Sequence, residues 1–133
     1  MQNKKGFTII ELLVVIAIIA VLAAIVLVNV TQYINKGKDA SAKGNLATLL
    51  TNGAVYFDGA TNYTGFLTSA GFNSVSGALT ASGMGYTVTS AGNATNWCAS
   101  VPLKVANVYC VDSSGAKREG ASSTCSNATF ACP

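Results

Sequence analysis

Positions 7 to 30 of the chain are almost uniformly hydrophobic. From Phe7 to Val30 the only polar side chains are Thr8, Glu11 and Asn29, and the stretch contains neither Gly nor Pro. As a helix it would extend about 36 Å, at about 1.5 Å per residue, which exceeds a bilayer core of about 30 Å. Because lipid offers a backbone no hydrogen-bond partners, a run of this length in a membrane has to be helical. The pattern predicts a membrane-spanning helix.

After Val30 the pattern becomes that of an amphipathic helix. Apolar or small residues recur at helical spacing on one face, at Leu46, Leu49, Leu50, Gly53, Ala54 and Phe57. This stripe predicts a surface on which a globular head packs. We expect Asp58-Gly59 to end the helix, since glycine readily adopts the left-handed conformation of a helix C-terminus. Residues 7–57 are therefore predicted as one helix, with 7–30 as its transmembrane or assembly part.

Residues 58–133 are predicted to form the globular head. Up to about residue 85 the sequence is rich in Gly, Ser, Thr and Asn, and we expect a connecting segment with a short helical turn near 66–70. Alternating patterns then predict short strands at 86–90, 97–104 and 108–112. An antiparallel sheet of three or four strands fits, with one face on the helix and the other facing solvent. The predicted fold class is α+β, a long N-terminal helix packed against a small antiparallel sheet with C-terminal disulfides.

Composition and charge narrow the function classes. The chain has 8 Lys and Arg against 5 Asp and Glu, a formal charge of +3, and no His. Without His, the commonest acid–base catalyst and metal ligand is missing, so we expect neither an enzyme nor a cofactor. Lys36, Lys38 and Lys43, with Asp39 among them, are more typical of a solvated helix face than of a phosphate-binding strip.

The four cysteines are Cys98, Cys110, Cys125 and Cys132. An exported head of this size has a small core and commonly depends on disulfides. Four cysteines allow three connectivities. A turn centred on Lys104 would place Cys98 opposite Cys110, which favours that bond and leaves Cys125 for Cys132. The lack of C-x-x-C spacing and of His argues against zinc, and the sequence predicts no metal site.

Glu11 is the anomaly of the apolar run. An acid at membrane depth is a functional hypothesis by default, and it calls for a cationic partner. A cut between Gly6 and Phe7 would create an amine four residues away, which could meet the carboxylate within one helix or between staggered helices. Gly6 has no side chain, so a protease can approach the backbone there.

The segment GFTIIELLVVIAIIAVLAAIV, preceded by the basic stretch MQNKK, resembles the processing and assembly segment of type IV pilins and of type II secretion pseudopilins. The resemblance implies that residues 1–6 are a leader peptide, removed after Gly6 by a membrane prepilin peptidase that also N-methylates Phe7. It further implies that Glu11 pairs with the Phe7 amine of a neighbouring subunit during filament assembly. Residues 58–133 match the family only in architecture.

The function that this resemblance implies is a structural subunit of a type IV pilus. The precursor would be a single-pass protein of the inner membrane with its leader in the cytoplasm. The product would be an extracellular filament, a helical homo-oligomer. Expected partners are the prepilin peptidase and N-methyltransferase, the pilus assembly platform, and DNA or a surface receptor. The resemblance allows adhesion, twitching motility, DNA uptake or protein secretion as the output.

Other interpretations stay open. A type II secretion pseudopilin fits the same N-terminal segment; such proteins often bind calcium, for which Asp112 could serve, although a single Asp among Ser and Gly is more often a turn former. A membrane-anchored binding module that never polymerises explains the span but neither Glu11 nor the Gly6–Phe7 pair. A secretory signal peptide explains the basic start but not the acid or the length of the run. N-x-T triplets, a weak indication of glycosylation, begin at Asn62, Asn93 and Asn127.

Overall fold

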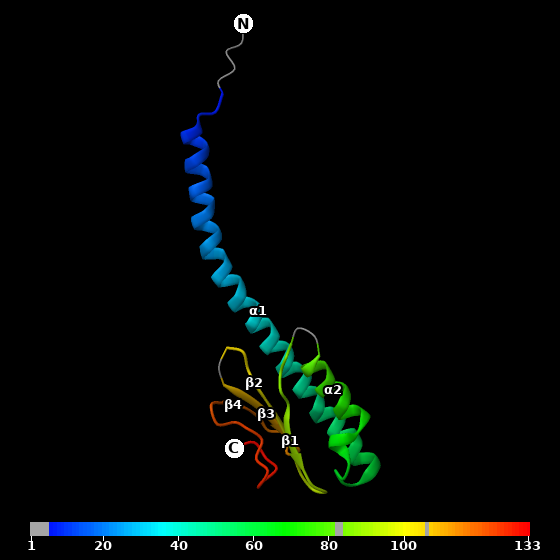
Figure 1. Ribbon diagram of the computed structural model, residues 1–133. Helices are drawn as coiled ribbons and strands as arrows, with labels where there is room; N and C mark the ends of the chain where they lie inside the picture. The colour runs from blue at the N-terminus through cyan, green and yellow to red at the C-terminus, as the bar shows by residue number, and fades with distance from the viewer. Residues whose placement is uncertain (1–5, 82–83, 106) are drawn as a thin grey trace. The chain divides into compact units, whose positions relative to one another are not determined.

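The computed structural model describes residues 6–81, 84–105 and 107–133. The chain forms two compact units, residues 1–34 and 35–133, which we call the N-terminal unit and the C-terminal unit. Helix α1, Ile9–Ala60, contributes to both units (Figure 1). Of the predicted leader, residues 1–6, only Gly6 belongs to the described residues.

The N-terminal unit consists mainly of the first part of α1, and its apolar side chains are exposed. An 18-residue window of this helix has a mean hydropathy of 3.3, and none of it is buried. Among the described residues, α1 is the one helix long and apolar enough to cross a membrane, judged by length and composition. No described element of the unit covers this surface, so its burial depends on lipid or on other molecules.

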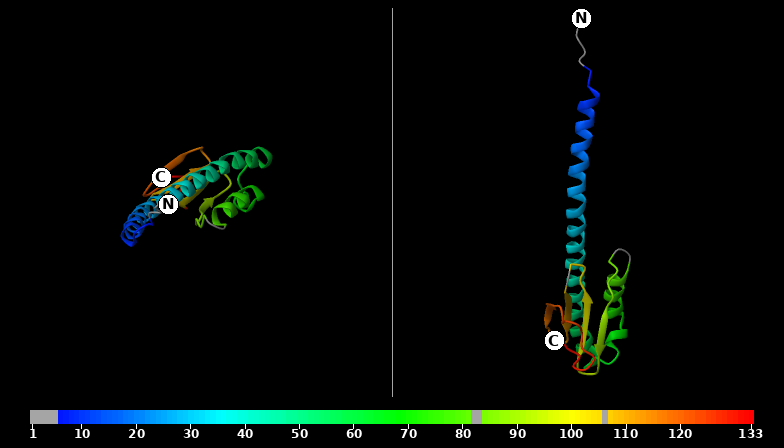
Figure 2. Two further views of the ribbon diagram at one scale, coloured as in Figure 1. Left: turned by 90° about the horizontal axis from the view of Figure 1, so that it is seen from above. Right: turned by 60° about the vertical axis from the view of Figure 1, so that its left-hand side comes forward.

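The C-terminal unit combines the second part of α1 with a short 3₁₀ helix, a second helix and a sheet. The elements are η1 (Phe66–Thr68), α2 (Ala70–Thr80), β1 (Thr89–Gly92), β2 (Trp97–Pro102), β3 (Val108–Asp112) and β4 (Lys117–Gly120). All strand pairs are antiparallel, and the order in the sheet is β1-β2-β3-β4. The sheet lies alongside the C-terminal part of α1, with α2 beside them (Figures 1 and 2). The predicted α+β class is confirmed.

The main core lies between α1 and one face of the sheet. Leu46, Leu49 and Gly53 of α1 are buried, as the stripe predicted, and the buried face extends back to Ala42. Trp97 of β2 packs against Gly53, where an added Cβ would come within 2.8 Å of the indole ring. The glycine therefore allows the helix and the largest core side chain to approach closely.

The far end of the predicted stripe lies outside this core. Ala54 and Phe57 are exposed, Phe57 to 42 %. With 3.6 residues per turn, Ala54 turns away from the centre of the face that Leu46, Leu49 and Gly53 define, whereas Phe57 lies near that face but beyond its last buried residue, Gly53. Phe57 instead stacks on Tyr63, with ring centroids 5.0 Å apart.

The connection between α1 and the sheet corrects two predictions. The segment expected to be mainly a loop contains the 11-residue helix α2, which starts where the Ser69 hydroxyl accepts a hydrogen bond from the Phe72 amide. Three side chains at helical spacing anchor α2 in the core: Phe72, Val75 and Leu79. The end of α1 also differs, because Gly59 stays helical and Thr61 takes the left-handed conformation, with φ of 59°.

The second face of the sheet is covered, which corrects the expectation that it faces solvent. Residues 121–133, which we call the C-terminal strap, lie over this face (Figure 2). Beneath the strap, Cys98, Ser100, Cys110 and Asp112 are all at most 3 % exposed. The Ser100 hydroxyl accepts a hydrogen bond from the Cys125 amide at 3.0 Å, so this buried polar side chain has a partner in the strap.

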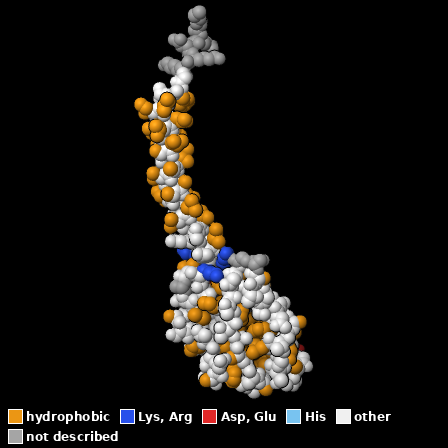
Figure 3. Space-filling model, in the orientation of Figure 1, with side chains coloured by type: hydrophobic (Ala, Val, Ile, Leu, Met, Phe, Trp, Pro, Cys, Tyr) orange, Lys and Arg blue, Asp and Glu red, His pale blue; other side chains and the backbone are white. Residues whose placement is uncertain are grey.

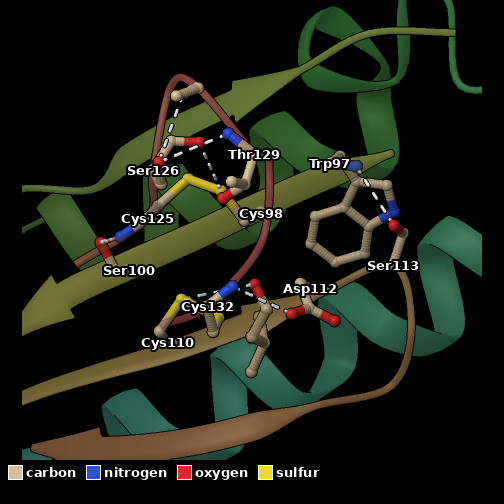
Figure 4. The surroundings of a disulfide bond; sticks show 12 residues. Trp97, Cys98, Ser100, Cys110, Asp112, Ser113, Cys125, Ser126, Thr129 and Cys132 are labelled. Carbon is tan, nitrogen blue, oxygen red and sulfur yellow. Dashed lines mark hydrogen bonds between the residues drawn. A yellow bond between two sulfur atoms is a disulfide. The ribbon is translucent and has the colours of Figure 1, made fainter. Parts of the chain in front are cut away.

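The disulfides join the sheet to the strap, as Figure 4 shows. They pair Cys98 with Cys125 and Cys110 with Cys132, so the expected pairs, Cys98 with Cys110 and Cys125 with Cys132, are wrong. The physical reason is the strand register, in which Cys98 lies opposite Asp112 and Cys110 opposite Ser100. Cys98 and Cys110 are therefore diagonal neighbours on one face, and each sulfur meets the strap instead.

Candidate processing and assembly site

Thr8 and Glu11 form a reciprocal hydrogen-bonded cap at the start of α1. The amide and the hydroxyl of Thr8 both donate to Glu11 Oε2, at 2.9 Å each, and the Glu11 amide donates to Thr8 Oγ1 at 3.3 Å. This arrangement is a capping box, which satisfies amides that the first helical turn leaves without intrahelical partners. In the folded chain, the carboxylate thus has a structural partner three residues before it.

Sequence reasoning missed Thr8 as a partner of the acid, although the signal was present. Thr followed three residues later by Glu, just before an apolar run, is the pattern of a capping box. Because Glu11 lies in an apolar run, the sequence suggested only an amine as its partner. The geometry shows that the same carboxylate can also fix where the helix begins.

Gly6 and Phe7 lie before the helix and are open to approach. The side chain of Phe7 is 88 % exposed, and an atom added at the Cβ position of Gly6 would have nothing within 4 Å. The peptide bond between them lies outside α1, which starts at Ile9. In the intact chain the Phe7 nitrogen belongs to a peptide bond, so it carries no positive charge until that bond is cut. The predicted Glu11–amine pair therefore belongs to a processed chain.

Asp112 acts as a turn former and holds the strap. Its Oδ1 accepts hydrogen bonds from the Ser114 amide at 2.9 Å and the Ala116 amide at 3.3 Å, and its Oδ2 accepts one from the Cys132 amide at 3.0 Å. Burial would raise the pKa of this carboxyl, but the hydrogen bonds from Cys132, Ser114 and Ala116 lower it below the ordinary value. Among the described residues, no group of three or more His, Cys, Asp or Glu side chains is placed to hold a metal ion.

Residues 1–27 match the family described as the prokaryotic N-terminal methylation motif. The chain is 34 % identical over 129 residues, 96 % of its length, to the type IV major pilin protein PilA of Myxococcus xanthus. It is 47 % identical over 62 residues to the type IV major alpha-pilin of Moraxella bovis. It is 46 % identical over 57 residues to the type IV wide pilus major component PilA4 of Thermus thermophilus. The comparison with solved structures gives no match.

The shorter alignments cover 46 % and 43 % of this chain. The chain spans 56 % of the Myxococcus relative and about 40 % of the other two (39 % and 40 %). The methylation motif overlaps the start of the apolar helix α1, so this chain combines such a motif with a helix-and-sheet head. By this motif and these partial matches, the chain is similar to type IV pilins.

Proposed function

We propose that this chain is the precursor of a type IV pilus subunit, cut between Gly6 and Phe7, N-methylated on Phe7 and polymerised through the apolar part of α1. The observation that carries the proposal is the N-terminal unit itself. It presents an open Gly6–Phe7 bond, one acid in the first helical turn, and an apolar helix surface that the described residues of the unit leave uncovered. The three relatives are named as pilus components, and pilins are structural subunits rather than enzymes.

The apolar side chains of α1 would be buried in two different environments, one before and one after assembly. Before assembly, its exposed Ile, Leu and Val side chains would be buried in the inner membrane. In a filament, the same side chains would be buried against neighbouring copies of the helix, and the cleaved Phe7 amine of one copy would meet Glu11 of the next. The charge pair would set the axial offset between copies, since apolar packing alone is non-directional.

Processing is tested by the mass of the N-terminal peptide in cells that contain a prepilin peptidase. We expect the mature chain to begin with methylated Phe7, and we expect Gly6→Leu to keep the leader because a bulky side chain blocks approach to the backbone. A mature wild-type protein that still starts at Met1 would overturn this part of the proposal.

The assembly role of Glu11 is tested by two variants that separate charge from capping. Glu11→Gln removes the charge but keeps an oxygen acceptor suited to a capping box, whereas Thr8→Ala breaks the box and keeps the charge. We expect filament yield, measured in sheared surface fractions, to fall at least ten-fold in Glu11→Gln and to stay within two-fold in Thr8→Ala. Membrane insertion of both precursors should be unchanged. The opposite ranking would show that the carboxylate serves the helix start and not the contact between subunits.

A further inference from the structure

The positive charges of the C-terminal unit lie on three of its elements. All the Lys and Arg residues after the leader lie in residues 36–43 of α1, in the turn between β2 and β3, and in β4; they are Lys36, Lys38, Lys43, Lys104, Lys117 and Arg118. Helix α2, strand β1 and the strap carry none. Figure 3 shows the basic side chains of one face gathered together at one end of this unit.

Asp39 ties two sequence-distant parts of this region together. Its Oδ1 accepts a hydrogen bond from the Lys104 amide at 2.7 Å and its Oδ2 accepts one from the Val105 amide at 3.1 Å. The Tyr86 hydroxyl also donates to Oδ1, and the Asp39 side chain is buried, with 6 % exposed. Lys104 and Val105 are thereby fixed beside the helical turn that carries Lys36 and Lys38.

An open cavity of about 360 Å³ lies at this junction. Its lining combines cationic side chains of α1, Lys36 and Lys43, with apolar side chains of the turn, Leu103 and Val105. Both carboxylates in the lining are already engaged: Asp39 by its three donors, and Glu119 by Lys43 at 2.6 Å.

The region has a net positive charge and an exposed apolar tip. Four lysines, Lys36, Lys38, Lys43 and Lys104, outnumber the two carboxylates, Asp39 and Glu119, so this part of the surface is positively charged. Val105 is 50 % exposed at the tip of the turn. Cationic groups around an apolar tip match a surface that presents phosphates above hydrocarbon.

The positions of these lysines in the chain indicate that the surface in question is a membrane. Lys36 and Lys38 follow Val30, the last residue of the apolar run, by six and eight positions in the same helix. In a membrane-inserted helix, Lys36 and Lys38 lie about 9 to 12 Å beyond the run, just outside a headgroup layer about 5 to 8 Å thick, which their long side chains can reach. Anionic lipids in that layer attract nearby lysines, and the attraction falls off within about one Debye length, about 8 Å at physiological salt.

We propose that Lys36, Lys38, Lys104 and Val105, which we call the lysine surface, bind anionic phospholipid headgroups of the leaflet from which α1 emerges. The contact holds the C-terminal unit against the membrane until the subunit is extracted into a filament. This inference rests on the membrane insertion included in the proposed function. It adds a lipid partner for residues outside the processing and assembly site.

The test uses the full-length chain in lipid nanodiscs of phosphatidylcholine alone or with about one third phosphatidylglycerol. Insertion is checked first, by co-elution of the chain with the discs. Each lysine is then acetylated with an amine-reactive reagent, and the labelling rate is read by mass spectrometry. We expect Lys38 and Lys104 to label at least three-fold more slowly with phosphatidylglycerol, and the difference to vanish in 1 M salt. Lys117 of β4 is the internal control and should label equally in both discs.

Two matched variants locate the effect. Lys38→Gln/Lys104→Gln and Lys117→Gln/Arg118→Gln each remove two positive charges. In the first variant, we expect the amides of the turn between β2 and β3 to exchange with deuterium at the same rate in both kinds of disc, as in the absence of lipid contact. In the second, exchange should stay slower with phosphatidylglycerol. Equal labelling of Lys38 and Lys104 in both discs, or equal effects of the two variants, would overturn the lysine surface while leaving insertion intact. A chain that does not co-elute with the discs would overturn both this inference and the membrane part of the proposed function.

Discussion

The two units bury their apolar side chains by different means. In the N-terminal unit, Phe7 and the Ile, Leu and Val side chains that follow are exposed, and the helix has no other described element of the unit to pack on. In the C-terminal unit, Trp97, Phe66 and Leu46 are at most 1 % exposed inside a small core, and two disulfides fasten the strap over the sheet. The second unit supplies its own burial, whereas the first requires a partner, as the proposed pilus subunit would.

The largest effect should come from removing either disulfide, since both disulfides belong to the C-terminal unit. Cys98→Ser/Cys125→Ser and Cys110→Ser/Cys132→Ser should each lower the free energy of unfolding by about 2 to 4 kcal/mol, because each bond closes a long loop in the unfolded chain. Thermal unfolding of the full chain in detergent, followed by Trp97 fluorescence, measures the loss. Membrane insertion of the same variants serves as the control and should be unchanged. Variants that unfold at the wild-type temperature would contradict the stabilising role of the disulfides.

A second variant perturbs the N-terminal unit instead, by placing a charge in its apolar helix. Ile19→Asp should disfavour insertion by about 2.5 to 3.5 kcal/mol, because Asp at the centre of a membrane helix loses its hydration. Resistance of the chain to alkaline extraction from membranes measures insertion, with Ile19→Leu as the control. Oxidative refolding of the purified chains in detergent should still form the disulfides of the C-terminal unit in both variants. Failure of the disulfides in Ile19→Asp alone would mean that folding of the C-terminal unit depends on the apolar helix.

A smaller effect is expected where α1 meets the sheet. Gly53→Ala places a Cβ within 2.8 Å of the Trp97 ring and should lower the free energy of unfolding by about 1 to 3 kcal/mol through overpacking. Gly44→Ala in the same helix is the matched control, since its Cβ would have nothing within 4 Å. The control should raise stability by about 0.5 to 1 kcal/mol by favouring the helix. Equal effects of the two variants would show that Gly53 is not a packing requirement.

An effect of similar size at neutral pH, about 1 to 3 kcal/mol, is expected for Asp39→Asn. Burial would raise the pKa of Asp39, but hydrogen bonds from Tyr86, Lys104 and Val105 lower it below the ordinary value. A carboxyl with a lower pKa in the folded chain stabilises the fold above about pH 4, and this contribution is lost as the pH falls below that value.

Denaturation of the C-terminal unit between pH 2 and pH 7 tests this prediction. The acid-dependent loss of stability should be smaller in Asp39→Asn than in the wild type. Asp58→Asn removes an exposed carboxylate from the same helix and should leave the wild-type curve unchanged. If the stability of Asp39→Asn depended on pH as that of the wild type does, the buried carboxylate would not contribute to acid stability.

The features that could be predicted from the sequence are those that a local pattern determines. An apolar run determines the first part of α1, a stripe at helical spacing determines the buried Leu46 and Leu49, and alternation determines the strands near Trp97 and Tyr109. The motif from Gly6 to Glu11 is likewise local, so the resemblance to pilins is visible in the sequence alone. In each case neighbouring residues carry the whole signal.

The features that were missed depend on contacts between distant residues. Helix α2 contains four Gly and Ser residues among its eleven and has weak intrinsic propensity, and it is held by the burial of Phe72, Val75 and Leu79. The disulfide pairing depends on strand register and on a strap that has no regular secondary structure. Helix α2 and the disulfide pairing both depend on the packing of the core, and the spacing of residues within one segment carries no information about that packing.

The diagonal placement of Cys98 and Cys110 has a consequence for oxidative folding. While the hairpin of β2 and β3 is still loose and residues 121–133 have not yet docked, these two thiols are the closest pair in the forming sheet. Oxidation at that moment would trap a non-native bond, and its rescue requires attack by another thiolate. Efficient maturation of this chain therefore calls for a compartment that reshuffles disulfides as well as one that forms them.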